Sequence, residues 1–291
     1  ASPGGLGTGA IPIRMEQPAA GRANVGRTWG TGPVTPLGWA SVFSVPLVVA
    51  LLIAFAITQV ANLVTTLYLH RALSHKAMTI GKPLELVMRT VLWLTMGIER
   101  REWVAVHRKH HVFSDEPQDP HSPIQKGVWK VTFGNVVYYR REAKRADTVQ
   151  TYARDLAPDR MERLFFSKGL LGVGISTVAL VVLFGPLTAA IIAVTHTVLY
   201  ILLGGCVNGL GHWFGARPHQ NKATNMRWLA LLTAGEGMHN EHHEYPRSPF
   251  FGATGWDIGG RIARVFAALH LLTLHTSGRL QRDSDPVPLA S

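Results

Sequence analysis

The chain has 291 residues, which is long enough for one large domain or two small ones. Its formal net charge is +11, although only 16% of its residues are charged and 47% are hydrophobic. Because a nucleic-acid-binding protein usually combines its basic charge with a more polar composition, this balance excludes nucleic acid as a partner and favours a lipid bilayer.

Residues 1–37 are rich in Gly, Pro, Ala and Thr and lack a sustained apolar period, so they predict a flexible N-terminal tail. Residues 276–291 predict a disordered C-terminal tail. The segment between them, 38–275, is predicted to be a single membrane domain.

The first apolar segment, residues 38–69, contains no charged residue. As one helix it would run ~48 Å, more than the ~30 Å hydrocarbon core of a bilayer, whereas as two spans it is too short by about eight residues. Two more apolar segments, 169–184 and 187–210, are separated only by Gly185-Pro186. The apolar segments therefore predict an all-α integral membrane protein and leave open whether it has three or about four transmembrane helices.

Residues 83–98 are apolar but include Glu85 and Arg89, and ~16 residues is short for a span. They predict an amphipathic helix that lies in the membrane interface. Basic residues gather in 100–168 and near the C-terminus, which places both regions on the cytoplasmic side. There we expect a helical cap, covered by a helix over 261–274.

Three histidine motifs hold eight of the fourteen histidines. They are His70-x4-His75, His107-x2-His110-His111 and His239-x2-His242-His243. In a helix, residues three or four apart share a face, whereas neighbours are splayed by roughly 100°. One H-x-x-H-H segment can therefore offer imidazoles to two nearby points, which suits a pair of ions such as iron, zinc or copper. Solvated histidines would explain one such motif, but three predict a dimetal site in the cap.

His70 and His75 pose a geometric condition. They lie five residues apart, or ~140° around an ideal α-helix. They can converge on one metal site only if the helix ends or unwinds between them.

Further polar residues lie close to these motifs. Asn208 and His212 are four apart and share a helix face, so we interpret His212 as another ligand and Asn208 as a direct or water-bridged one. Asp115 and Asp119 are placed to accept hydrogen bonds from ligand histidines, although a solvated acidic turn explains them equally well. His196, in the middle of an apolar segment, is interpreted as a structural, hydrogen-bonded histidine.

Together these motifs resemble those of the membrane-bound fatty acid desaturases, most of all the acyl-CoA Δ9 (stearoyl-CoA-type) branch and its bacterial relatives. Asp119-Pro-His121 and His212-x-Phe-Gly215 add to the resemblance, which covers about residues 38–275. It implies a non-haem di-iron enzyme that desaturates a fatty acyl chain with O2 as co-substrate. In a bacterium, it implies a multi-pass protein of the cell membrane with its active site on the cytoplasmic side.

The resemblance also implies nine histidine ligands to two iron ions, and a water molecule held by Asn208. The nine histidines are His70, His75, His107, His110, His111, His212, His239, His242 and His243. Around them, Asp115, Asp119 and His121 would support the ligands through hydrogen bonds.

We expect substrate contacts from Trp103, Arg140, Arg141, Gly204 and Gly205. The chain departs from the animal acyl-CoA enzymes at two places. Gly205 stands where they have a bulky Trp, and Ala105 stands where an Arg helps to hold CoA. The double-bond position and the acyl carrier, whether CoA, acyl carrier protein or a lipid, therefore stay open.

The only cysteine, Cys206, excludes an intramolecular disulfide, a rubredoxin site and a cysteine-bound iron–sulfur cluster within the chain. Electrons must therefore come from an external donor, such as a ferredoxin, a rubredoxin or a cytochrome with its reductase.

Two alternatives stand beside a desaturase. A fatty acyl hydroxylase, acetylenase or oxidative decarboxylase would use the same metals, and the sequence does not separate these reactions. A membrane metal transporter would need polar residues through the depth of the membrane. The histidine motifs instead collect at one face, so the sequence disfavours a transporter.

Overall fold

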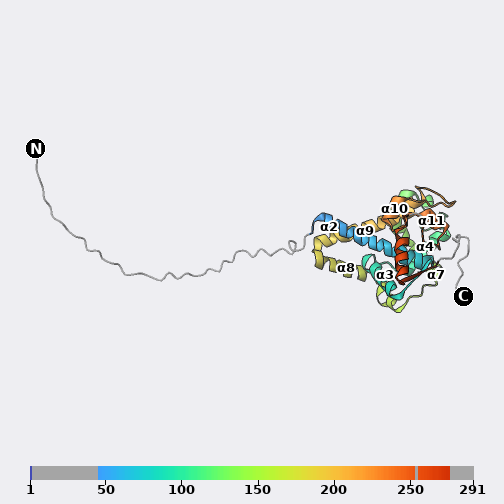
Figure 1. The fold of residues 1–291 in the computed structure, drawn as a ribbon, viewed down its shortest axis with the longest axis horizontal. Coiled ribbons are helices and arrows are strands. Elements are labelled where there is room, and N and C mark those ends of the chain that lie inside the picture. Colours follow the sequence, from blue (N-terminus) through green and yellow to red (C-terminus); the bar gives the residue numbers. More distant parts are fainter. Residues whose placement is uncertain (2–44, 253–254, 276–291) are drawn as a thin grey trace. The chain divides into compact units, whose positions relative to one another are not determined.

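A computed structural model describes residue 1 and residues 45–252 and 255–275. All its helices and strands belong to one unit, Trp39–Ser291. Figure 1 shows α2 (Leu47–Val64), α8 (Gly169–Phe184) and α9 (Pro186–Gly209) at one end of this unit and shorter elements at the other. The predicted tails, 1–37 and 276–291, lie outside the described residues apart from residue 1.

The first apolar segment forms one continuous helix over its described part. α2 passes directly into η1 (Thr65–Ser74), which has the wider π-helical geometry. Pro46 precedes the first turn, where its missing N–H removes no helical hydrogen bond, so it starts the helix and does not break it. At 28 residues, Leu47–Ser74 is longer than a bilayer core requires, so the turns that carry His70 can extend beyond the lipid.

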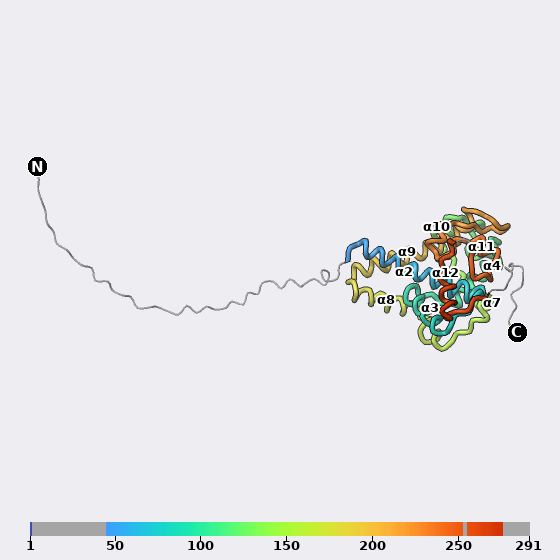
Figure 2. The backbone as a smooth tube through the Cα atoms, in the orientation of Figure 1, coloured from blue at the N-terminus to red at the C-terminus, as the bar shows by residue number. Residues whose placement is uncertain are grey.

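The other two apolar segments form the predicted hairpin. α8 and α9 are joined at Gly185, whose φ of 76° lies in the region that favours glycine. α9 continues into a short 3₁₀ turn, η3 (Leu210–His212), and packs against both α2 and α8. The histidine-bearing ends of α2–η1 and α9–η3 therefore lie at the same end of the helix bundle (Figure 2).

Two helices of the described residues are long and apolar enough to cross a membrane, Leu47–Ser74 and Pro186–His212. α8 is apolar but has only 16 residues. Leu52, Leu170 and Val182 on these helices are 61%, 91% and 69% exposed, which is typical of surfaces that contact lipid. The structure thus agrees with membrane association, while the number of spans stays a prediction.

The polar segments fold into shorter helices around the ends of α2–η1 and α9. These helices are α3 (Lys82–Thr95), α4 (Arg100–Val112), α5 (Pro123–Lys126), α6 (Val128–Ala143), α7 (Ala146–Tyr152), η2 (Glu162–Phe166), α10 (Arg227–Leu232), α11 (His239–Glu244) and α12 (Ile258–Ala268). The helix predicted over 83–98 is α3, which packs against α2 and α8 and ends at Thr95. That this cap faces the cytoplasm stays a prediction.

The described residues are mostly helical, as predicted, and include one pair of short strands that the sequence did not indicate. β1 (Met78–Ile80) pairs antiparallel with β2 (Leu272–Leu274). The helix predicted as far as Leu274 ends at Ala268, and the residues after it form β2. Ile80 and Leu272 face each other in the pair and are buried in the hydrophobic cluster that contains Tyr68 of η1. Burial against η1 therefore outweighs the helical pattern at this end of the chain.

His196 is structural, as its isolated position predicted. It is 5% exposed, and its Nδ1 lies 2.9 Å from the hydroxyl of Thr58 on α2. Its Nε2 lies 3.3 Å from the carbonyl oxygen of Thr95 on α3. The ring therefore ties α9 to two neighbouring helices.

Candidate metal centre

The nine predicted ligand histidines lie together and form two neighbouring groups. The five-histidine group consists of His70, His75, His107, His111 and His242. The four-histidine group consists of His110, His212, His239 and His243. Within each group, one ring nitrogen from every residue lies within 4.8 Å of all the others. Each group can therefore hold one metal ion.

Each H-x-x-H-H motif serves both groups, as helical spacing predicts. In α4, His107 and His111 are four residues apart and join the five-histidine group, while His110 joins the four-histidine group. In α11 the assignment is reversed: the pair four apart joins the four-histidine group, and His242 joins the other. Residues four apart share a helix face, so each short helix bridges the two groups.

His70 and His75 converge because η1 is π-helical. Hydrogen bonds in a π-helix connect residues five apart, and the N–H of His75 donates to the carbonyl of His70 at 3.1 Å. The ring centroids are 5.0 Å apart. The expected unwinding is thus confirmed, and the helix also ends between them, at Ser74. Arg108 secures that end, since its guanidinium donates to the carbonyls of Leu73 and Ser74 at 2.6 and 3.0 Å.

Two buried carboxylates from the predicted turn hold histidines of the four-histidine group. Asp119 accepts a hydrogen bond from Nδ1 of His110 at 2.9 Å. Asp115 accepts one from Nδ1 of His212 at 2.8 Å. Such bonds fix the imidazole tautomer and turn Nε2 toward a metal. A solvated acidic turn is excluded, because both aspartates are almost completely buried.

The sequence analysis missed a third carboxylate, Glu236. It accepts a hydrogen bond from Nδ1 of His70 at 2.6 Å and another from the hydroxyl of Thr66. The signal was its position between Gly235 and Gly237, just before the last histidine motif. A Cβ at Gly235 would lie 2.3 Å from the carboxylate of Asp257, so glycine allows this loop to pack closely against the site.

A buried ion pair that the sequence analysis also missed supports the five-histidine group. Arg71 donates to Asp257 at 2.6 and 3.0 Å, and its guanidinium lies 3.7 Å from the ring centroid of Phe251. Phe251 in turn contacts the rings of His70 and His242, with centroids 5.5 and 4.7 Å away. Arg71 therefore fastens the segment after α11 onto η1, beneath two ligands.

Burial keeps five of the ligand histidines neutral, and two of the supporting carboxylates are ionised. Burial, together with neighbouring imidazoles, holds the pKa well below its usual value in His75, His107, His239, His242 and His243. Burial alone would raise the pKa of Asp119 and of Glu236, but interaction with His110 and His70 lowers it below the usual value in each. Neutral imidazoles backed by negative charge favour a bound cation.

The Nε2 atoms face one another at short distances. Nε2 of His70 is 2.9 Å from Nε2 of His242, and Nε2 of His212 is 3.0 Å from Nε2 of His239. His70 and His212 give Nδ1–H to a carboxylate, so each has only a lone pair at Nε2. Lone pairs converging in this way suit a metal ion between them, and an all-imidazole donor set suits iron, zinc or copper.

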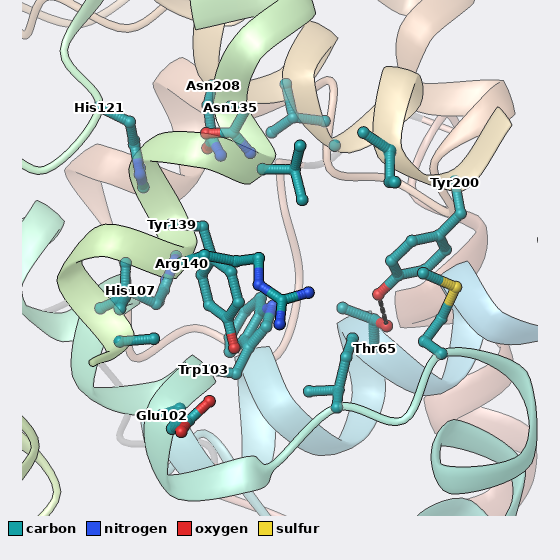
Figure 3. Close-up of a pocket in the computed structure, with 18 of the residues that line it drawn as sticks. Thr65, Glu102, Trp103, His107, His121, Asn135, Tyr139, Arg140, Tyr200 and Asn208 are labelled. Atoms are coloured by element: carbon teal, nitrogen blue, oxygen red, sulfur yellow. Dashed lines mark hydrogen bonds between the residues drawn. The ribbon is translucent and has the colours of Figure 1, made fainter. Parts of the chain in front are cut away.

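A cavity of about 460 Å³ lies beside both groups (Figure 3). His70 and His107 reach it from the five-histidine group, and His239 reaches it from the four-histidine group. Trp103 lines the cavity and stacks on His107, with ring centroids 4.9 Å apart. A molecule in the cavity can therefore contact ligands of both metal positions.

Of the remaining predicted substrate contacts, some line the cavity and others do not. Arg140 and Gly204 line the cavity, as does Asn208, which belongs to neither histidine group. Arg141 is exposed and is not part of the cavity wall. Gly205 packs against α6, where a Cβ would lie 2.0 Å from the carbonyl oxygen of Thr132. The structure thus assigns Gly205 to close packing of α6 and α9 and places it away from the cavity.

His121 lies beside the four-histidine group and is 4% exposed. Its ring centroid is 4.6 Å from that of His110, and its backbone N–H donates to Asp119 at 3.0 Å. Burial lowers the pKa of His121 to about 3, so the ring is neutral. With His110 and Asp119 it forms a third cluster of possible ligands. His110 is shared with the four-histidine group, however, and its Nδ1 is already bonded to Asp119.

Comparison with known proteins agrees with these observations. A family model described as fatty acid desaturase matches residues 43–252. An sn-1 stearoyl-lipid 9-desaturase of Synechocystis is 30% identical over 66% of the chain and 60% of that protein. An acyl-CoA C20 Delta5-desaturase of Anemone leveillei is 33% identical over 67% of the chain and 62% of that protein. A hex-5-enoyl-[acyl-carrier protein] acetylenase of Moorena producens is 27% identical over 65% and 64%. The chain thus matches less than two thirds of the length of each.

Proposed function

The chain belongs to the fatty acid desaturase family, and from this premise we propose that it catalyses O2-dependent desaturation of a fatty acyl chain. The observation that carries the proposal is the pair of histidine groups beside one cavity. We assign an iron ion to each group, held by the nine histidines, with a water molecule on Asn208 completing the four-histidine position.

Iron with O2 would supply the oxidant for two adjacent, unactivated methylenes, a reaction beyond side-chain acids and bases. The residues of the chain do the rest. Asp115, Asp119 and Glu236 hold their histidines in one tautomer and orientation. The cavity aligns the acyl chain beside both groups and keeps bulk water from the reacting carbons.

We propose the Δ9 position for the new double bond, supported by the relative from Synechocystis that is named a 9-desaturase. In this arrangement Trp103 lies against the acyl chain, because it lines the cavity and stacks on His107. The distance between the carrier-binding end of the cavity and the two histidine groups would then set which carbons react.

The carrier is proposed to bear a phosphate group near the cavity. Arg140 and Lys144 line the cavity and are exposed, so they are accessible to an anion. CoA and the phosphopantetheine arm of acyl carrier protein contain phosphate, as does a phospholipid. The relatives are named for a stearoyl-lipid, an acyl-CoA and an acyl-carrier-protein substrate. Electrons would come from an external protein, since Cys206 is the only cysteine.

A second candidate is conversion of an existing double bond to a triple bond, because one relative is named an acetylenase. The metal positions would be the same. The two candidates differ in whether a saturated or an already unsaturated chain is the substrate.

The test uses the full-length protein in lipid nanodiscs, loaded with iron and supplied with O2 and a ferredoxin or cytochrome donor. Saturated acyl chains on CoA, on acyl carrier protein and on phospholipid form three parallel arms, and mass spectrometry identifies the products. Two irons per chain and a product that lacks two hydrogens support the proposal, and the productive arm names the carrier. A product with an added oxygen, or one shortened by a carbon, would replace desaturation with hydroxylation or decarboxylation.

The proposed carrier site has its own test in the same assay. Arg140→Ala should raise KM severalfold, as expected for one exposed ionic contact worth ~1 kcal/mol. Arg141→Ala is the matched control, because Arg141 is its neighbour but lies outside the cavity wall. Equal KM values for the two variants would remove Arg140 from the carrier site.

A further inference from the structure

One end of the cavity has buried polar atoms that no described residue satisfies. Nδ1 and Nε2 of His121 and Oδ1 of Asn135 are buried without a hydrogen-bond partner among the described residues. Figure 3 shows His121, Asn135 and Asn208 at the same end of the cavity, and all three line it. Leaving such an atom buried and unpaired is unfavourable, so a polar ligand is expected there.

A third metal ion does not fit this position. It would need His110 together with His121 and Asp119. Nδ1 of His110 is bonded to Asp119, and the remaining nitrogen belongs to the four-histidine group. His121 therefore has no complete ligand set of its own among the described residues.

Water does fit. A buried water molecule typically makes about three hydrogen bonds to groups that otherwise have no partner. A neutral histidine offers one donor and one acceptor, and an asparagine side chain offers both kinds of group. His121, Asn135 and Asn208 thus provide donors and acceptors along one end of the cavity wall.

The proposed reaction requires such water. Desaturation converts R–CH2–CH2–R′, O2, two electrons and two protons into R–CH=CH–R′ and two water molecules. The protons must reach the metals, and the product water must leave. All four residues of the four-histidine group are buried and only His239 of them lines the cavity, so a polar route to that group has to follow the cavity wall.

We propose that His121, Asn135 and Asn208 bind a chain of ordered water molecules that links the four-histidine group to the cavity and conducts protons to O2 as it is reduced. This inference rests on the proposed desaturase function. His121 acts as a positioning residue: its two buried ring nitrogens hold water by hydrogen bonds. Asp119 orients it by accepting its backbone N–H, a bond that survives substitution of the side chain.

The first experiment compares His121→Phe, which keeps an aromatic ring without hydrogen-bonding atoms, with His121→Gln, which restores them. Val137→Ile is the control, because Val137 lies on the same helix as Asn135 but is exposed and outside the cavity wall. Proton delivery by placed groups contributes about 10²-fold, so we expect kcat of His121→Phe to fall by about tenfold to a hundredfold. Electrons should be diverted to H2O2, formed from O2, two electrons and two protons, so less product forms per electron pair.

In this experiment His121→Gln should recover much of the coupling between electrons and product, and Val137→Ile should match the unchanged protein. The iron content should be equal in all four proteins. Unchanged coupling in His121→Phe would overturn the proposal. So would equal losses in the Phe and Gln variants, because these would indicate a structural role for the ring.

The second experiment does not depend on activity. The protein is loaded with zinc, which binds imidazole but has no redox chemistry, and its structure is solved at a resolution that reveals water. Ordered water within hydrogen-bond distance of a ring nitrogen of His121 and of Asn135 supports the proposal, and its absence overturns it. If the iron-loaded protein fails to desaturate while this water is present, the proposed function fails and the water site stands.

Discussion

The two histidine groups use the same ligand chemistry in different surroundings. All residues of the four-histidine group are buried, whereas His107 and His111 of the five-histidine group are partly exposed. Asp115 and Asp119 hold two of the four histidines by hydrogen bonds. The four-histidine group is thus fixed by enclosure and by carboxylates, while the five-histidine group has more ligands and a more open position.

One repeated motif can thus build two metal positions with different surroundings. The H-x-x-H-H motifs are equivalent in sequence, yet one helical pair faces the enclosed group and the other faces the open group. The asymmetry comes from what surrounds the motifs, above all the turn that carries Asp115 and Asp119. Metal bound at the four-histidine position should therefore exchange more slowly than metal at the five-histidine position.

Loss of a ligand histidine should have the largest effect on activity, and the adjacent residues His110 and His111 should differ in which metal ion is lost. His111→Ala and His110→Ala should each abolish activity and lower the metal content to about one ion per chain, because a ligand is lost from a different group in each. The ion retained by His111→Ala should resist a chelator longer than the ion retained by His110→Ala. Metal analysis during chelator treatment measures this, and the fold is checked by circular dichroism. Full activity in either variant, or equal exchange rates, would contradict the assignment.

A smaller effect is expected from the carboxylates. Asp119→Asn should weaken metal binding at the four-histidine position about 10–100-fold, because the supporting hydrogen bond to His110 loses its charge. Glu236→Gln should do the same at the five-histidine position through His70. Zinc titration of the metal-free proteins measures both binding affinities and so shows whether the four-histidine or the five-histidine position is weakened. His219→Gln is a control, since His219 pairs with Glu241 and belongs to neither group.

Acid should destabilise the metal-free protein. The buried ligand histidines have folded-state pKa values well below the ordinary 6.5, so the unfolded chain binds more protons than the folded one as the pH falls. Their contribution is fully present above about pH 6.5 and is lost below it, by up to about 1.4 kcal/mol per pH unit for each buried ring. Thermal unfolding of the metal-free protein between pH 7.5 and 5.5 measures this loss. A flat profile would show that these rings are not buried and neutral.

The smallest effects on activity are expected at Asn208 and Trp103, which lie beside the histidine groups and are not among the histidine ligands. Asn208→Ala should lower kcat only severalfold, because a water molecule can stay on the metal without its amide. Trp103→Leu, beside His107, should act mainly on KM, because it removes a surface for the substrate and leaves the ligands intact. Steady-state kinetics separates the two parameters. Unchanged activity in Asn208→Ala would remove this residue from the site.

Much of the site could be predicted from sequence because helical spacing is simple geometry. The sharing of His107, His110 and His111 between two metal positions follows from their separations, and the structure has this arrangement. For Asp115 and Asp119 the sequence offers two equal interpretations, a support for ligand histidines and a solvated turn, and only their burial decides between them. The hairpin at Gly185 and the helix at 83–98 were also predicted correctly.

Other parts depend on contacts between distant segments, which a single sequence does not display. Glu236 meets His70 across 166 positions, and Arg71 meets Asp257 across 186. The pairing of β1 with β2 likewise joins opposite ends of the described chain, so local periodicity favoured a helix there. Gly205 looked like a substrate contact because the close approach of α6 to α9 was not visible in the sequence.

The π-helical geometry of η1 explains why the first histidine motif has a longer spacing than the other two. A wider turn accommodates one extra residue, so the five-residue interval from His70 to His75 performs the same pairing that a four-residue interval performs in α4 and α11. The spacing of the motif therefore reports how many residues the local helix has per turn. A chain that lost one residue here and returned to α-helical geometry would keep its ligand pair although the spacing of its motif changed.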